Sequence, residues 1–212
     1  MKLNENGIHE LLANYELVKP RIIERFANKI TRDMNHSDRV LKPIRYTNLM
    51  MEYVIDVTDF IEEFEDDENG AYVVVINNML NVWNTDIDEI SNIAKFNTPR
   101  LLPSNVQTMG SMLGVSETQS PMVVVTNNKL NRGAGAILYK SSEEKVKELL
   151  GTDFYILPSS THEILCVSKR DFSPEGLFDM VTEINNSSTV SDEDILDYNI
   201  FELKSGKLKA LF

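Results

Sequence analysis

The segment PSSTHE, residues 158–163, gathers the side chains of this sequence that are best suited to chemistry: serine hydroxyls, an imidazole and a carboxylate. The residues that follow, EILCVSK (163–169), have the composition of a β-strand. On a strand, Ser160 and His162 would share one face and Glu163 would lie on the other. Two rises of roughly 3.3 Å would separate the Cα atoms of Ser160 and His162 by about 6.6 Å, which permits a hydrogen bond. This pattern allows a catalytic site.

Known catalytic motifs do not surround this segment. No G-x-S-x-G sequence frames either serine, and HEILC lacks the second histidine of H-E-x-x-H. The whole chain has three histidines and one cysteine, so we expect no metal site and no cofactor. The alternatives to catalysis are a Pro-Ser turn whose polar groups bond to the backbone, and a segment that contacts a ligand or a partner.

A second segment would complete a catalytic site if the fold brought it close. Arg100 follows N-T-P, and an arginine beside the serine, histidine and glutamate of PSSTHE could bind an anionic substrate. The similar sequences LLPS (101–104) and ILPS (156–159) would place the two segments side by side on one sheet. The hypothesis is then a hydrolase or transferase that uses Ser160, His162, Glu163 and Arg100.

The glycine-rich segment NRGAGA (131–136) follows a predicted strand, as a phosphate-binding loop would. However, it leads into ILY, which favours another strand, and it lacks both GK[ST] and a second G-x-x-G. We therefore interpret it as a hairpin connection.

The composition limits the partners that make physical sense. The formal net charge of −12 disfavours direct contact with nucleic acid or an anionic membrane, because both require basic surfaces. An acidic surface favours a basic protein partner, or serves solubility alone. The single cysteine, Cys166, excludes an internal disulfide, and no stretch resembles a signal peptide or a membrane span. We expect a cytoplasmic protein.

The most acidic stretch is EEFEDDENG, residues 62–70. We interpret it either as the solvated end of a helix or as an acidic surface offered to a basic partner. A calcium loop is disfavoured, because the D-x-D-x-D-G spacing is missing. The candidate partner-binding carboxylates are Glu62, Glu63, Glu65, Asp66, Asp67 and Glu68.

Apolar residues recur at helical spacing through the first third of the chain. The longest such series runs from Tyr46 to Phe64 and predicts a five-turn helix with one buried face. We therefore expect residues 1–68 to form a helical N-terminal region.

The nine-residue phrase VVVINNMLN (73–81) returns as VVVTNNKLN (123–131). Each copy reads as a β-branched strand that ends at an Asn-Asn pair. A helix is predicted after each copy, and an LPS sequence ends each unit. Two related strand–helix units, 72–104 and 122–160, explain this pattern.

The C-terminal part predicts a strand, a helix that begins at Ser173-Pro174, and a closing strand at 199–204. The fold class is therefore α+β, with a helical N-terminal part, two related strand–helix units and a C-terminal strand–helix–strand. Residues 69–212 would form one α+β domain.

FNTPRLLP, MVVVTNNKLNRGAGAILY and GTDFYILPSSTHEILCV together resemble an uncharacterised domain-of-unknown-function family of gut Firmicutes and their mobile elements. The resemblance covers residues 46–205, and the PSS-x-HE block is its most specific part. It implies a shared fold and a bacterial or phage origin, and no activity. The matching residues are Asn97, Thr98, Pro99, Arg100, Asn127, Gly133, Ala134, Leu157, Pro158, Ser159, Ser160, His162 and Glu163.

Two functional hypotheses follow from the charge and from this resemblance. The first is a non-catalytic protein-binding module of a phage or mobile element, whose carboxylates occupy a basic groove on a host enzyme. Nucleic-acid-handling enzymes have such grooves, so an anti-defence inhibitor of an RNA-guided nuclease would be one instance. The second is the hydrolase or transferase described above.

Overall fold

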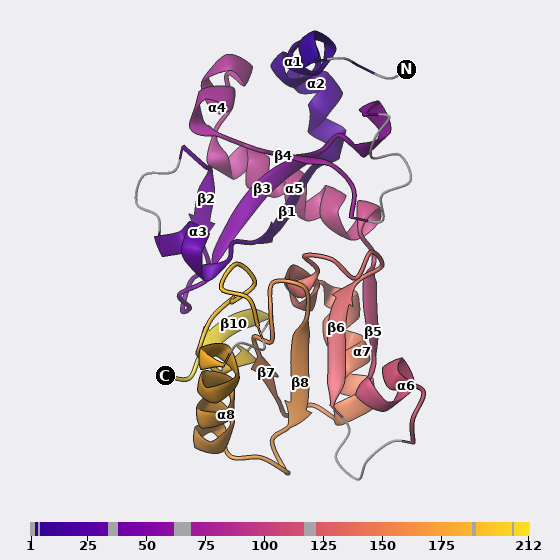
Figure 1. The fold of residues 1–212 in the computed structure, drawn as a ribbon, viewed down its shortest axis with the longest axis vertical. Helices are drawn as coiled ribbons and strands as arrows, with labels where there is room; N and C mark the ends of the chain where they lie inside the picture. The colour runs from indigo at the N-terminus through magenta and orange to yellow at the C-terminus, as the bar shows by residue number, and fades with distance from the viewer. Residues whose placement is uncertain are drawn as a thin grey trace.

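Two antiparallel sheets, one in each half of the chain, form the framework of the protein (Figure 1). The computed structural model describes residue 3 and residues 5–33, 38–61, 69–116, 122–187, 190–204 and 206–212. Helices lie against both sheets, and the predicted α+β class is confirmed.

The N-terminal half builds sheet 1 around a central strand, β3. Strand β1 covers one edge of β3, while β2 and β4 pair with successive parts of its other edge. The elements of this half are α1 (Glu5–Ala13), α2 (Tyr15–Val18), η1 (Lys19–Arg21), β1 (Ile22–Phe26), α3 (Lys29–Asp33), β2 (Leu41–Pro43), β3 (Met50–Asp56), η2 (Thr58–Phe60), β4 (Tyr72–Val74), α4 (Asn77–Trp83) and α5 (Ile87–Leu101).

The helix predicted from Tyr46 to Phe64 is wrong, because Met50–Asp56 is strand β3. The chain does begin with helices α1 and α2, but β1, β2 and β3 all lie within the region that periodicity predicts as helical. Met51 to Ile55 are buried without a break, as in a central strand covered on both faces. The apolar residues of such a continuously buried strand also satisfy a helical period by accident, so periodicity could not distinguish a strand from a helix here.

Helix α5 covers the free edge of β1. Asp86 begins the helix by accepting hydrogen bonds from the backbone N–H groups of residues 88 and 89. Near its other end, the Asn97 amide donates to the carbonyl oxygens of Lys19 and Ile22, and the Thr98 hydroxyl accepts from the Glu24 N–H at 2.9 Å. These contacts replace a neighbouring strand along β1.

The C-terminal half builds sheet 2, in the order β10-β9-β7-β8-β6-β5. Helix α7 covers one face of this sheet through Val146, and α8 covers the other through Leu177 and Val181. Its elements are β5 (Ser104–Thr108), α6 (Met109–Leu113), β6 (Val123–Asn127), η4 (Ala134–Leu138), α7 (Lys140–Leu150), β7 (Phe154–Leu157), β8 (Ile164–Ser168), α8 (Pro174–Asn186), β9 (Phe201–Lys204) and β10 (Lys207–Ala210).

The two copies of the nine-residue phrase share a strand and then diverge. In the first copy, β4 ends at Val74 and Asn77 begins helix α4. In the second copy, β6 continues through Asn127, whose side chain then accepts hydrogen bonds from the N–H groups of Lys129 and Asn131 to close a turn. LLPS begins at the last residue of helix α5, whereas ILPS begins within strand β7.

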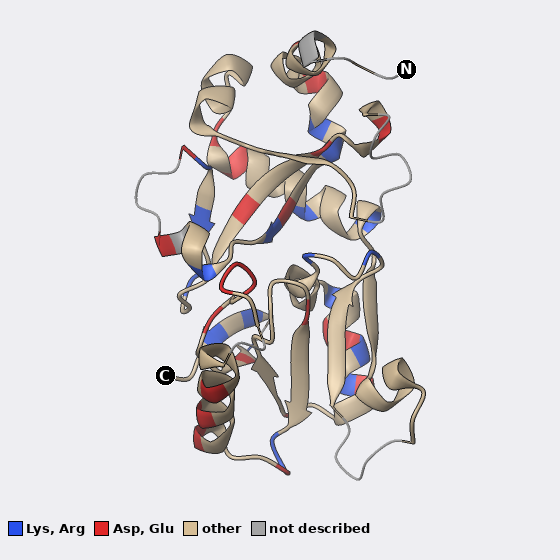
Figure 2. Cartoon of the chain, in the orientation of Figure 1, with Lys and Arg blue, Asp and Glu red and all other residues tan. Residues whose placement is uncertain are grey.

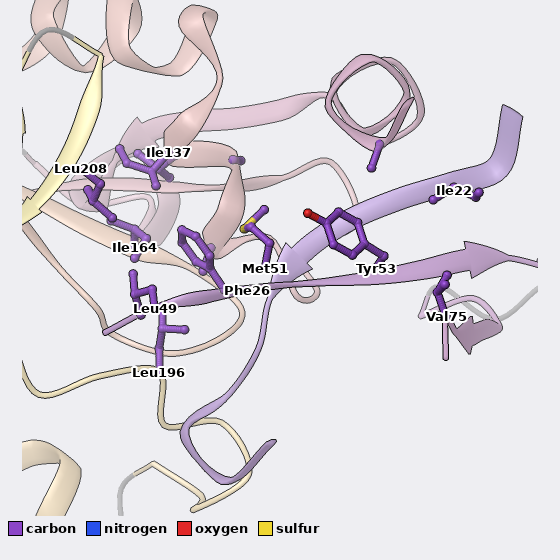
Figure 3. Close-up of a cluster of buried hydrophobic side chains, with 14 of the residues drawn as sticks. Ile22, Phe26, Leu49, Met51, Tyr53, Val75, Ile137, Ile164, Leu196 and Leu208 are labelled. Carbon is purple, nitrogen blue, oxygen red and sulfur yellow. The ribbon is translucent and has the colours of Figure 1, made fainter. Parts of the chain in front are cut away.

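One hydrophobic core joins the two halves (Figure 3). Phe26, Leu49 and Met51 come from the N-terminal half, and Ile137 and Leu208 from the C-terminal half. All five side chains are at most 6% exposed, so the space between the sheets is packed here.

Candidate functional site

The PSSTHE segment is the turn that joins β7 to β8, and strand β8 begins only at Ile164. The prediction that Ser160 and His162 share one face of a strand is therefore wrong, because both residues precede the strand. The Ser159 and Ser160 hydroxyls both donate to Glu163 Oε1, at 3.0 and 3.1 Å. Ser160 Oγ also accepts from the His162 N–H at 3.0 Å. The serines and the glutamate thus stabilise the turn itself.

The His162 ring is engaged at both nitrogens. Nδ1 accepts from the Arg132 backbone N–H at 3.3 Å, so Nε2 carries the proton and donates to Asp194 Oδ1 at 3.0 Å. Burial disfavours ionisation of Asp194, but hydrogen bonds from Ser191, His162 and Thr161 outweigh burial and hold its pKa below the usual value. The ring therefore connects three loops, and the Ser160 hydroxyl hydrogen-bonds to Glu163 rather than to His162.

Arg100 lies at the end of α5 and donates to the carbonyl oxygen of Pro20 at 3.2 Å. Among the contacts of the described residues, none joins Arg100 to Ser160, His162 or Glu163. The structure thus keeps the last three in one turn and directs the arginine toward the N-terminal segment.

The NRGAGA segment packs against PSSTHE rather than opening toward a ligand. The Gly133 N–H donates to the carbonyl of His162, and the Ala134 N–H donates to the carbonyl of Thr161. A Cβ atom at Gly133 would lie 2.4 Å from the Asn127 nitrogen, so this glycine permits close approach of two backbones. The following residues form the short helix η4, which corrects the predicted strand at ILY. With these N–H groups already bonded, the segment does not form a phosphate loop.

The remaining reactive side chains also form no recognisable site among the described residues. Burial raises the pKa of the Cys166 thiol far above its usual value, and the side chain is fully enclosed. Within the described ranges, no three His, Cys, Asp or Glu side chains cluster as metal ligands. No helix in that part of the chain has the length and apolar character needed to cross a bilayer.

The predicted acidic cluster, Glu62, Glu63, Glu65, Asp66, Asp67 and Glu68, lies outside the described residues. The structure instead reveals an acidic surface on α8 that sequence reasoning missed (Figure 2). Glu175, Asp179 and Glu183 are exposed and spaced four residues apart, so they follow one side of the helix. Asp192 and Glu193 are exposed in the loop beyond the helix. We call these five residues the α8 acidic face.

The α8 acidic face differs from the exposed carboxylates of α7 in forming no ion pair with another described residue, although Arg132 lies near enough to Glu193 to interact with it. Helix α8 contains no Lys or Arg, and neither its three carboxylates nor those of Asp192 and Glu193 form an ion pair among the described residues. On α7, by contrast, Glu143, Glu144 and Glu148 each pair with a lysine of the same helix. The four-residue spacing on α8 was the signal in the sequence that could have revealed this surface.

Comparison of the sequence with known protein families identifies the family to which the chain belongs. The model of a family of unknown function, DUF5688, matches residues 4–205. No curated protein and no solved structure matches significantly.

Proposed function

We propose that this chain, which belongs to the DUF5688 family of unknown function, is a non-catalytic protein-binding module that recognises a basic protein surface. The observation that carries the proposal is the α8 acidic face, five exposed carboxylates that form no ion pair with another described residue. The contacts within PSSTHE support it, because they engage the side chains of the alternative hydrolase or transferase in holding a turn.

Like charges along one side of a helix repel each other, and those near the C-terminus also oppose the helix dipole. A basic partner would relieve both effects when it binds. Complementary charge of this kind mainly accelerates association and selects the partner, while adding less to affinity.

A groove that binds nucleic acid is the partner surface with the right chemistry, since Lys and Arg line it to neutralise phosphates. Within this proposal, the partner is a nucleic-acid-handling host enzyme, for example an RNA-guided nuclease. The module would then act as an anti-defence protein of a phage or mobile element and compete with nucleic acid for the groove.

The experiment compares two triple variants that change net charge equally. Glu175→Gln/Asp179→Asn/Glu183→Gln neutralises α8, and Glu143→Gln/Glu144→Gln/Glu148→Gln neutralises the lysine-paired carboxylates of α7. Association with an immobilised RNA-guided nuclease is measured at low and high salt, with DNA cleavage as a second readout. We expect the α8 variant to associate at least about tenfold more slowly at low salt, and the α7 variant to behave like wild type.

High salt should reduce the difference in association rate between the α8 variant and the wild type, because dissolved ions screen exposed charges. Equal association rates for the two variants would remove the α8 acidic face from the mechanism. Failure of the wild-type chain to bind this nuclease would reject this partner, and a DNA polymerase and an RNA helicase would be the next basic grooves to test.

A further inference from the structure

A cavity of about 740 Å³ lies between the two halves of the protein, away from PSSTHE and from α8. Its walls come from sheet 1, from α5, from the start of α7 and from the β9–β10 hairpin. This volume is within the range of pockets that enclose small organic ligands.

Three polar side chains at the cavity have buried oxygen atoms: Glu24 Oε2, which has no hydrogen-bond partner among the described residues, and the hydroxyls of Tyr53 and Ser91, which lie close enough to interact with each other but make no other hydrogen bond in that part of the chain. Tyr53 is 0% exposed and Ser91 is 1% exposed. A buried polar group that lacks a partner destabilises the folded state, because it has lost its hydrogen bonds to water. Three buried polar groups on one cavity whose hydrogen bonding is incomplete indicate a ligand that supplies the missing bonds.

The fold brings these groups together from three elements. Glu24 and Tyr53 are Cα partners across the β1–β3 pair, so their side chains project from the same face of sheet 1. Helix α5 is held on β1 by Asn97 and Thr98, and this places Ser91 against that face. Figure 3 shows the Tyr53 hydroxyl directed toward Met51, which also lines the cavity.

The electrostatics show how strongly this end of the cavity is desolvated. Burial raises the pKa of the Glu24 carboxyl to about 7, although the ammonium groups of Lys95 and Lys42 oppose the rise. Burial also raises the pKa of Tyr53 to about 12, and the neighbouring Ser91 hydroxyl offsets part of this. The buried Glu24 Oε2 thus lies in a desolvated position with no hydrogen-bond donor among the described residues.

Other residues of the cavity wall are positively charged and favour a negatively charged group on the ligand. Arg45, Lys95, Lys140 and Lys207 are exposed residues of the cavity wall, and they attract an anion. Arg45, Lys95 and Lys207 form no ion pair with another residue that the structure describes. The other lining residues are mainly apolar and aromatic, with Ile44, Tyr46, Met51, Leu138, Tyr139 and Leu208.

We propose that this cavity binds a nucleoside phosphate. The base would donate an N–H to Glu24 and bond the Tyr53 and Ser91 hydroxyls, while the phosphate would lie among the exposed cations. A simple anion would leave Glu24 without a donor, and a purely apolar ligand would add no bond to any of the three polar groups. A flat base attached to a phosphate satisfies the buried polar end, the aromatic wall and the cationic mouth together.

Calorimetric titration of the full chain with AMP, GMP, CMP and UMP, each beside its nucleoside and beside inorganic phosphate, tests the proposal. We expect one-to-one binding of at least one nucleotide with a micromolar Kd, and at least about tenfold weaker binding of its nucleoside, a difference of about 1.4 kcal/mol. Inorganic phosphate alone should bind more weakly still. Absence of binding by all four nucleotides, or equal binding of nucleotide and nucleoside, would overturn the proposal.

Substitutions at cavity residues then test whether the nucleotide binds in this cavity. Tyr53→Phe, Ser91→Ala and Glu24→Gln should each weaken nucleotide binding at least about fivefold, since each removes a bond to the base. Thr182→Val is the matched control, because the Thr182 hydroxyl is also buried and unpartnered but lies on α8. Wild-type affinity in all three cavity variants would show that nucleotides bind elsewhere and would reject the site.

The exposed lysines provide a test that does not depend on the core. Lys95→Gln/Lys207→Gln should reduce the ratio of nucleotide to nucleoside affinity, whereas Lys145→Gln/Lys147→Gln on α7 should leave it unchanged. An unchanged ratio in the first variant would contradict the placement of the phosphate.

Discussion

Glu24 and Tyr53 face each other across the β1–β3 pair, yet the buried Glu24 Oε2 has no hydrogen-bond partner among the described residues, and the buried Tyr53 hydroxyl has only the Ser91 hydroxyl beside it. Sheet 1 thus carries a polar pair in a position where most sheets carry apolar side chains. The Glu24 carboxylate is disfavoured there, because burial outweighs the attraction of Lys95 and Lys42. Stability should therefore depend on the protonation of this one residue.

Glu24 is expected to make the protein less stable as the pH rises from about 4.5 to about 7. Its pKa rises from 4.5 to about 7 in the folded protein, so in this window the folded state holds a proton that the unfolded state has lost. Stability from this source is complete below pH 4.5 and is lost as the pH approaches 7. The full effect corresponds to at most about 3 kcal/mol.

Glu24→Gln should remove this pH dependence, because an amide does not titrate. The measurement is urea unfolding from pH 4.5 to 8, with the difference between wild type and variant taken at each pH. Glu175→Gln, at an exposed carboxyl on α8, is the control and should leave the wild-type slope intact. A Glu24→Gln protein with the same slope as wild type would contradict the raised pKa.

Replacing His162 is expected to lower stability while sparing partner binding. His162→Ala removes the bonds to Asp194 and to the Arg132 N–H, and it leaves Asp194 with one donor fewer. Since the His162 side chain is 33% exposed, we expect a loss of about 1–2 kcal/mol, toward the low end for a buried hydrogen bond. Denaturant unfolding measures it, and His9→Ala, at an exposed position on α1, is the control. A His162→Ala protein of wild-type stability that had lost all function would instead favour a catalytic histidine.

Gly133→Ala is expected to destabilise the protein, while Gly135→Ala two positions away should be nearly neutral. A Cβ atom at residue 133 would lie 2.4 Å from the Asn127 nitrogen, whereas one at residue 135 would lie 3.8 Å from its nearest neighbour. Overpacking of backbone against backbone costs about 1–3 kcal/mol or more. Thermal unfolding of the two variants tests the difference, and equal stability would show that the backbones can separate freely.

The sequence predicts the C-terminal half better than the N-terminal half, for a physical reason. Ser173 and Pro174 begin α8 as their capping preferences indicate, and β8 and β9 lie within the predicted strands. Strand β3 was missed, because a strand buried on both faces has no alternation to reveal it. Caps act locally, whereas the burial of β3 depends on elements far along the chain.

The candidate sites also show that sequence patterns reveal local features better than contacts between distant residues. Ser160, His162 and Glu163 attract notice because they are neighbours in sequence, and the structure shows a turn stabilised by its own side chains. Glu24 and Ser91 attract none, since they lie 67 positions apart and belong to no recognisable motif. Strand register and the docking of α5 bring them to one cavity, and no local pattern encodes that contact.

The last prediction concerns Glu52, which is buried between two arginines. Its carboxylate bonds Arg25 at 2.8 Å from the paired strand and also bonds Arg39, which precedes β2. The Glu52 side chain is 4% exposed, while those of Arg25 and Arg39 are 17% and 37% exposed. Glu52→Gln preserves the shape but leaves two guanidinium groups without a counter-charge.

We expect Glu52→Gln to lower the free energy of unfolding by about 2–3 kcal/mol, less than the 3–5 kcal/mol of a fully buried pair because both arginines reach solvent. Arg39→Gln should lower the free energy of unfolding by less, since Arg25 still pairs with Glu52. Glu202→Gln is the comparison in sheet 2, where the partners are Lys169 and the largely exposed Lys204, and its cost should also be smaller. Urea unfolding of the three variants gives the order. If Glu52→Gln proved the least damaging of the three, the ion pairs around Glu52 would not be what joins β1, β3 and residue 39.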